Sequence, residues 1–189
     1  MKLFNDAGYH AVIFDYNGFG ESASVDFEYP RDLVAVAKAV QREFSNLPIA
    51  AVGASFGAMR AIEAGGLPGC PFDVVVAEAV APSLIDFWKN YPVPAATLRG
   101  MTMLMPRYEE RLRPTFMLKK YRKGSLLLIH SEADRYTPPE HGVAIAEAAP
   151  QGVIIQRLVL TRAAHTFAIR DEPEEYRAKV LDFLGRHLR

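Results

Sequence analysis

The sequence predicts an α/β fold, with a mostly parallel open sheet flanked by helices, and three observations support this prediction. Short apolar runs recur along the chain, as in strands that are buried on both faces of a parallel sheet. Segments with helical periodicity lie between these runs. The run 49–53 passes almost directly into a helix-forming segment at 58–64, which is typical of a strand that leads into a helix. With 189 residues, half of them hydrophobic, the chain is most simply one domain, 1–189.

The expected strands and helices alternate along most of the chain. The apolar runs predict strands at 10–15, 49–53, 73–79, 125–130 and 153–160. The helical patterns, with proline or glycine near several of their ends, predict helices at 2–7, 30–44, 58–64, 138–149 and 173–188. Since this order of elements is the signature of an open α/β sheet, we expect the strands to run parallel.

Residues 82–123 interrupt this alternation. Prolines at 82, 92, 94, 106 and 114 divide the segment into short helical pieces rich in Met and aromatic residues. The segment carries nine basic and three acidic residues, although the whole chain is neutral. We expect a helical lid insertion over the carboxyl ends of the strands. Its apolar side chains could contact a substrate or form a small core of their own, and its positive charge could attract an anionic partner or be solvated.

The composition excludes several classes of protein. Lys plus Arg equals Asp plus Glu at 22 each, so no global field favours nucleic acid or a membrane surface. The single cysteine, Cys70, excludes an internal disulfide, and no apolar run approaches the roughly 20 residues of a membrane span. The first ten residues lack the apolar stretch of a signal peptide. We therefore expect a soluble, cytoplasmic protein. No Cys, His or carboxylate cluster has metal-ligand spacing, so we expect no metal or cofactor.

A candidate nucleophile lies where the second expected strand meets its helix. Ser55 stands at the centre of the pattern Gly53-Ala-Ser-Phe-Gly57. A sharp turn of this kind needs residues that are nearly free of side chain on both sides, so that strand and helix can pass closely. The turn lifts the serine hydroxyl clear of the backbone, and the amides of the following helix point toward an oxyanion that forms beside it. Ser55 could also be an ordinary turn serine.

An acid and a base follow two later strands. Asp134 lies just past the strand 125–130, and His165 lies five residues past Leu160. Because parallel strands end on the same side of a sheet, the loops with Ser55, Asp134 and His165 should converge at one edge. A serine hydroxyl is a weak nucleophile at neutral pH, and a base oriented by an acid is what activates it.

Other residues compete for these roles. Glu132 is the alternative acid, although it takes the earlier position in its loop. Asp171 and Glu172 are expected in the first turn of the last helix, where acidic residues favour the helix N-terminus. Four histidines compete with His165 for the role of base. We expect one before a strand at the far edge of the sheet, one at a strand end and two on surface helices: His10, His130, His141 and His187.

Four stretches together resemble the α/β-hydrolases, in particular the lidded serine esterases and the serine aminopeptidase-like group. AVIFDYNGFGES is similar to a strand ending in D-x-R-G-x-G-x-S, although Asn17 stands where arginine is usual. GASFG matches the nucleophile turn, HSEADRYTP resembles the acid loop, and AAHTF resembles the histidine loop. The resemblance implies that Ser55 is the nucleophile, Asp134 the acid, His165 the base and the Phe56 amide one oxyanion donor. It also places a lid at 82–123.

The expected activity is hydrolysis of a small-molecule acyl substrate. A serine hydrolase of this type cleaves an ester, a thioester or a small amide through an acyl-enzyme intermediate. The alternative is a catalytically impaired hydrolase-like module that serves in binding or assembly.

The alternative rests on the N-terminal part of the sequence. In the family that the chain resembles, another strand lies between those equivalent to 10–15 and 49–53, and the loop after it supplies the second oxyanion amide. That strand should precede a full helix, but only about six helical residues stand before Gly8. Since an empty slot would expose unpaired backbone groups, we expect a longer natural product, a homodimer, or direct pairing of 10–15 with 49–53. An isolated monomer should then be a weak catalyst.

Overall fold

The computed structural model describes residues 1–26, 28–44, 47–105 and 113–189. Its sheet has four strands, all parallel, in the order β1-β2-β3-β4. Their bounds are Ala50–Ala54 for β1, Val74–Glu78 for β2, Gly124–Ser131 for β3 and Val153–Leu160 for β4. The parallel sheet and four of the five predicted strands are therefore confirmed.

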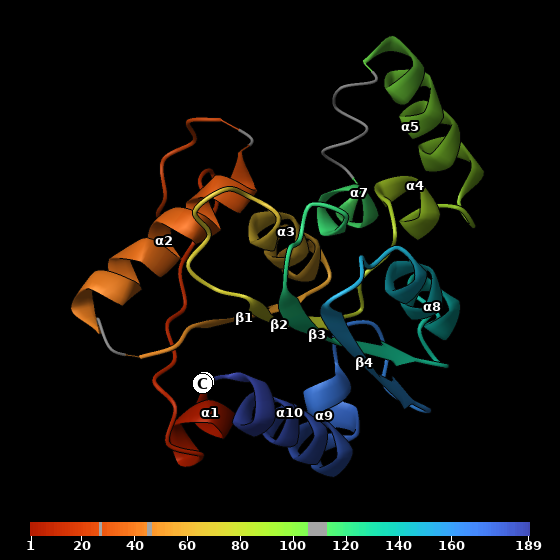
Figure 1. Ribbon diagram of the computed structural model, residues 1–189. Coiled ribbons are helices and arrows are strands. Elements are labelled where there is room, and N and C mark those ends of the chain that lie inside the picture. Colours follow the sequence, from red (N-terminus) through yellow and green to blue (C-terminus); the bar gives the residue numbers. More distant parts are fainter. Residues whose placement is uncertain (27, 45–46, 106–112) are drawn as a thin grey trace.

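Helices cover both faces of the sheet (Figure 1). One layer consists of α2 (Tyr29–Glu43), α3 (Phe56–Gly65), α7 (Pro114–Leu118) and α8 (Pro139–Glu147). The opposite layer consists of α1 (Lys2–Asp6), α9 (Ala168–Asp171) and α10 (Pro173–His187). The short α9 is an element that the sequence patterns did not predict. The others match the predicted helices or lie within the segment 82–123.

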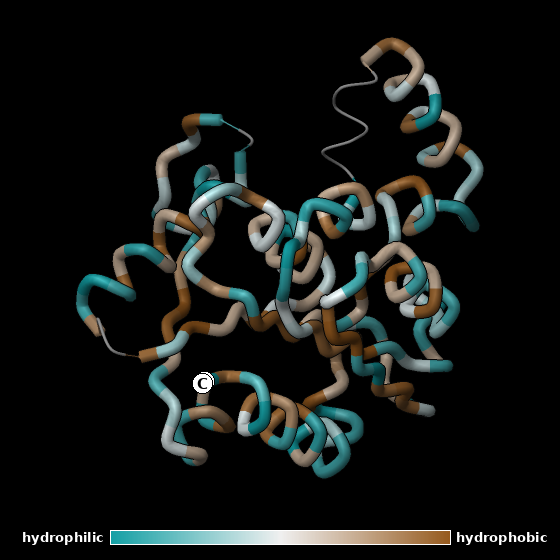
Figure 2. The backbone as a smooth tube through the Cα atoms, viewed as in Figure 1, coloured by the Kyte–Doolittle hydropathy of each residue, from teal (hydrophilic) through white to brown (hydrophobic). Residues whose placement is uncertain are grey.

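The core consists of two apolar layers, one on each side of β2 and β3. Val75 and Leu126 face the layer that contains α3, whereas Val76 and Leu127 face α10. All four side chains are fully buried. Figure 2 shows the hydrophobic colour concentrated along the sheet and mixed with hydrophilic colour along the helices. Each such side chain contributes about 1.5–3 kcal/mol through the removal of apolar surface from water, which holds the strand ends in place.

The predicted strand at 10–15 is wrong. Residues 9–16 form no strand, and β1 has β2 as its neighbour on one side and no paired strand on the other within the described chain. Direct pairing of 10–15 with 49–53, one of the three alternatives for this part of the sheet, is therefore wrong as well. The segment contacts the rest of the chain through side chains such as His10, whose ring stacks on that of Phe44 at a centroid distance of 5.0 Å. Ile13 in the same segment is 72% exposed. An apolar run favours a strand only where another backbone can pair with it.

The described parts of the segment 82–123 contain short helices, as expected. These helices are α4 (Leu84–Phe87), α5 (Pro92–Leu104) and α7. The sequence analysis also counted five residues of this segment that lie outside the described residues: Pro106, Arg107, Glu109, Glu110 and Arg111. In Figure 1, α5 lies farther from the sheet than α4 and α7. Met103 and Leu104 on α5 are both 84% exposed, so they do not form a small core of the insertion.

No helix in the described ranges is both long enough and apolar enough to cross a lipid bilayer.

Candidate active site

Ser55 occupies the turn between β1 and α3. It has a φ of +49°, a conformation that costs a non-glycine residue energy and persists where the surroundings hold it. A Cβ on Gly53 would lie 2.5 Å from the backbone of Gly57, so the strand and the helix approach as closely as predicted. A Cβ on Gly57 would meet nothing within 4 Å. The need for a residue without a side chain therefore applies to Gly53 and not to Gly57.

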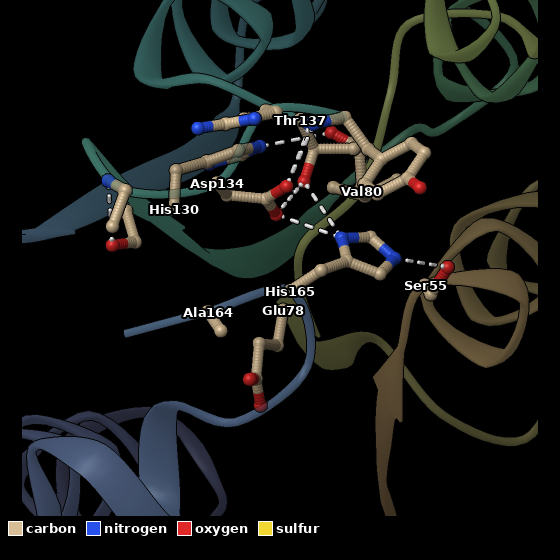
Figure 3. Close-up of polar contacts among 12 residues, drawn as sticks. Ser55, Glu78, Val80, His130, Asp134, Thr137, Ala164 and His165 are labelled. Carbon is tan, nitrogen blue, oxygen red and sulfur yellow. Dashed lines mark hydrogen bonds and ion pairs between the residues drawn. The ribbon is translucent and has the colours of Figure 1, made fainter. Parts of the chain in front are cut away.

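The structure brings together the three side chains that the sequence analysis singled out (Figure 3). His165 Nε2 lies 2.9 Å from Ser55 Oγ, and His165 Nδ1 lies 2.7 Å from Asp134 Oδ2. A neutral imidazole with its proton on Nδ1 donates to Asp134 and accepts from the Ser55 hydroxyl. This arrangement leaves Nε2 free to take the serine proton.

Asp134 is held in its ionised form by several donors. It is buried, which by itself raises the pKa of a carboxyl group. Hydrogen bonds from His165, from the Thr137 hydroxyl and from the Tyr136 and Thr137 backbone amides outweigh burial and lower the pKa of Asp134 to about 2. The alternative acid, Glu132, is exposed. The structure therefore places a charged carboxylate against the His165 ring at neutral pH.

Two of the other histidines are buried in the layer of α8. His130 Nε2 donates to the Val80 carbonyl at 2.8 Å, and burial lowers the pKa of His130. His130 is thus the satisfied strand-end residue that was expected. His141 was expected on a helix surface, but it is buried, and neither ring nitrogen has a hydrogen-bond partner among the described residues. Burial lowers the pKa of His141 to about 4.

The remaining two histidines bond or stack away from Ser55. His10 stacks on Phe44, as described above. His187 Nδ1 lies 3.1 Å from Ser125 Oγ, and its Nε2 lies 3.2 Å from Gln156 Nε2, so it contacts the start of β3 rather than lying on an open surface. His165 is the histidine that shares a hydrogen bond with Ser55.

Two carboxylates hold the loop before His165, and the sequence analysis assigned them another role. Glu172 accepts hydrogen bonds from Arg162 N at 2.8 Å and Ala163 N at 2.9 Å, while Asp171 accepts from Ala164 N at 3.0 Å. Asp171 ends α9, and Glu172 precedes α10 without capping it, so neither acts as a first-turn acid of the last helix. A buried loop amide needs an acceptor, which Glu172 supplies to Ala163, and the same two carboxylates also bond to the neighbouring Arg162 and Ala164 amides.

Two groups of aromatic side chains lie near the candidate site, one around Phe56, which directly follows Ser55, and one against the His165 ring. In the first group, the ring of Phe56 contacts Tyr29 at 5.2 Å and Tyr16 at 5.9 Å. In the second group, Phe87 and Tyr136 lie 5.5 and 5.4 Å from the His165 ring. Phe87 belongs to α4, so the segment 82–123 reaches the candidate site. Phe56, directly after Ser55, is 39% exposed.

The Phe56 amide opens α3 directly after Ser55. The first N–H groups of a helix have no carbonyl partner within that helix, and they carry the positive end of its dipole. This amide is therefore available to an anionic oxygen next to Ser55. Among the described residues, no group of three or more His, Cys, Asp or Glu side chains is arranged to hold a metal ion.

The sequence pattern of the prolyl oligopeptidase family matches residues 1–189. The chain belongs to this family. The predicted resemblance to the α/β-hydrolases is confirmed, because the chain belongs to this family and solved structures with the α/β-hydrolase fold superpose on it. Family membership supports an enzyme of the hydrolase class and leaves the substrate open.

Individual proteins are similar to this chain in sequence or in fold. The human protein ABHD12B is 29% identical over an alignment of 161 residues, which covers 79% of this chain and 44% of ABHD12B, so the chain spans less than half of that relative. The esterase Pf2001 of Pyrococcus furiosus superposes with a TM-score of 0.78 at 21% identity, over all of this chain and 74% of the esterase. The acylaminoacyl peptidase of Pyrococcus horikoshii gives 0.68 at 18% identity, over 85% of this chain and 28% of the peptidase.

Sequence reasoning missed several residues of the site in this prolyl oligopeptidase family member. Thr137, which is fully buried, donates to Asp134 through both its amide and its hydroxyl. The short spacing Asp134-x-x-Thr137, followed by proline, was the available signal, since such side chains bond to nearby backbone in tight turns. No comparable pattern in the sequence indicated that Asp171 and Glu172 bond to the loop before His165.

Proposed function

We propose that the chain is a serine hydrolase that cleaves an ester, thioester or small amide through a Ser55-His165-Asp134 triad. The observation that carries the proposal is the continuous hydrogen-bonded path from Asp134 Oδ2 through His165 to Ser55 Oγ, with links of 2.7 and 2.9 Å. A base within hydrogen-bond reach of a serine, itself oriented by an acid, is the arrangement that activates a serine nucleophile.

The proposed reaction proceeds in two halves. Ser55 Oγ attacks the substrate carbonyl carbon while its proton moves to His165 Nε2, and Asp134 stabilises the resulting imidazolium. The carbonyl oxygen becomes an oxyanion that accepts from the Phe56 N–H. His165 then donates its proton to the leaving group, which departs and leaves an acyl ester on Ser55. In the second half, water repeats the attack and releases the acid. We propose that the reaction needs no metal or cofactor.

We also propose that residues 82–123 form a lid that shapes the substrate site. Phe87 of α4 contacts the His165 ring and stacks on Tyr136 at 5.2 Å, which supports a role beside the substrate. The aromatic surface favours an acyl or aromatic group. The nine basic residues of the segment against three acidic ones favour an anionic substrate, and such a preference weakens as salt rises. Rates for matched neutral and anionic esters at low and high salt would test it.

Two substitutions test the triad. Ser55→Ala and His165→Ala should each abolish turnover of a short p-nitrophenyl ester, whereas the exposed Ser24→Ala should leave it unchanged. Circular dichroism would show that each variant keeps its fold. Full activity in folded Ser55→Ala would rule out the proposal.

The second candidate is a hydrolase-like binding or assembly module with an incomplete oxyanion hole. Its basis is that we assign the Phe56 amide as an oxyanion donor and assign no second donor in the described part of the chain. Losing one donor typically costs about a hundredfold to a thousandfold in turnover. A fluorophosphonate probe separates the two candidates, because labelling at Ser55 requires an activated serine.

Two further expectations can be tested directly. Light scattering would test whether the chain forms the expected homodimer. Cell fractionation would test whether the protein has the expected cytoplasmic location.

A further inference from the structure

Glu78 connects the two halves of the candidate active site. It is the last residue of β2, and its side chain is buried. Its backbone carbonyl accepts the N–H of Ser55 at 2.9 Å, and its side-chain Oε1 accepts the N–H of Ala168 at 3.0 Å. Ala168 lies three residues after His165. One residue therefore contacts both the turn that carries the serine and the loop that carries the histidine.

The backbone on each side of this connection is constrained. Ala79, which follows Glu78, has a φ of +53°, and its N–H donates to the Ile129 carbonyl at 2.8 Å. Thr166, which follows His165, has a φ of +65°. Residues of this kind persist in the left-handed region where neighbouring contacts hold them, at a cost of about 1–3 kcal/mol each. The bond from Ala168 to Glu78 is one of the contacts that hold the histidine loop in that conformation.

Charge links Glu78 to His165 as well. The titratable groups that face the Glu78 carboxyl are His165, Asp134 and Tyr176, and His130 lines the same small cavity. Burial raises the pKa of Glu78, while a positive charge on His165 lowers it. Figure 3 shows the Glu78 carboxyl directed away from the imidazole ring, so it acts without a direct bond.

We propose that Glu78 is a positioning residue for the hydrolytic reaction: its side chain and its backbone carbonyl together hold the His165 loop in register with the Ser55 turn. This proposal rests on the proposed function. Glu78 does not touch the reacting atoms, and Asp134 remains the acid that bonds to His165. The role explains why an acidic side chain lies buried at the end of a strand that is otherwise wholly apolar.

Two substitutions test the acceptor. Glu78→Gln keeps an oxygen that can accept from Ala168, so kcat should stay within about threefold of the unsubstituted chain, with little change in KM. Glu78→Leu removes the acceptor and should cost about a hundredfold in kcat, again with little change in KM. The control is Glu147→Gln, which removes one charge from the exposed end of α8.

A second measurement does not depend on turnover. NMR hydrogen exchange of the Ala168 amide should be faster in Glu78→Leu than in the unsubstituted chain and unchanged in Glu78→Gln. If the unsubstituted chain neither turns over esters nor reacts with a fluorophosphonate, the proposed function fails, while the exchange rate still tests Glu78. An Ala168 exchange rate that is unchanged in Glu78→Leu would overturn the proposal, and so would a folded Glu78→Leu variant with the kcat of the unsubstituted chain. If Glu78→Leu does not fold, Glu78→Met, which also lacks the acceptor oxygen, replaces it.

Discussion

Thr137 donates two hydrogen bonds to Asp134, one from its backbone N–H at 3.1 Å and one from its hydroxyl. The hydroxyl bonds to Oδ2, the same oxygen that faces His165 Nδ1. The carboxylate is thereby fixed in the rotamer that orients the imidazole. A residue three positions along the chain thus determines the direction in which the acid points.

Thr137→Val should lower kcat about tenfold, because the hydroxyl donor disappears while the backbone amide and the volume of the side chain remain. Thr137→Ser keeps the hydroxyl and should stay within about threefold of the unsubstituted chain. Ester hydrolysis at saturating substrate measures both. Equal kcat values for the two variants would show that the hydroxyl does not orient Asp134.

Asp134 should stabilise the fold in a defined pH range. Its pKa is lowered from 3.8 to about 2 in the folded chain, so the unfolded chain binds more protons between these values. The stabilisation is complete above about pH 4 and disappears as the pH falls through 2, and a shift of this size corresponds to about 2 kcal/mol. Urea unfolding of the unsubstituted chain and of Asp134→Asn at several pH values would show it. The difference in free energy of unfolding should be smallest at the lowest pH.

His141 should make the fold sensitive to mild acid. Its pKa is lowered from 6.5 to about 4 in the folded chain, so protonation is easier after unfolding. The neutral ring is tolerated above about pH 6.5, and stability is lost as the pH falls from there toward 4. His141→Phe removes the buried ring nitrogens and should reduce this loss of stability. Thermal midpoints at pH 7 and pH 5 measure the effect, and an undiminished acid loss in His141→Phe would contradict it.

Gly53 and Gly57 should differ sharply in their tolerance of alanine. The Cβ of Gly53→Ala would lie 2.5 Å from the backbone of Gly57, so the β1–α3 turn must open, at a cost of about 3 kcal/mol or more. Gly57→Ala enters open space in the first turn of α3 and should be neutral or stabilise by up to about 1 kcal/mol. Chemical denaturation of both variants tests the pair. Similar losses would show that the motif glycines do not act through close approach.

The sequence allowed the sheet and the site to be predicted for related reasons. Wholly apolar runs indicate strands buried on both faces, and side chains that directly follow parallel strands meet at one edge. Ser55, Asp134 and His165 were found in this way, and the structure places them within hydrogen-bonding distance. The same reasoning failed for 10–15, because hydrophobicity reports a tendency to be buried and says nothing about whether a neighbouring backbone is present.

The contacts that hold the triad were harder to predict. The bond from Ala168 to Glu78 joins residues 90 positions apart, and only the packing of β2 against α9 brings them together. Glu172 followed the pattern of a helix N-terminus, yet its oxygens accept from Arg162 and Ala163 instead. Local sequence patterns predict which groups need a partner, and tertiary structure decides which partner they find.

Ser55, Ala79 and Thr166 are the residues other than glycine that have a positive φ within the described chain. All three lie in the segments that build the candidate site. Glycine at Ala79 or Thr166 would relieve local strain, and it would also let the backbone visit conformations in which Ser55 and His165 no longer face each other. Selection for heat resistance alone would therefore favour glycine at positions where selection for turnover favours a bulkier residue. The residue type found at these two positions therefore indicates whether selection for heat resistance or selection for turnover has been stronger.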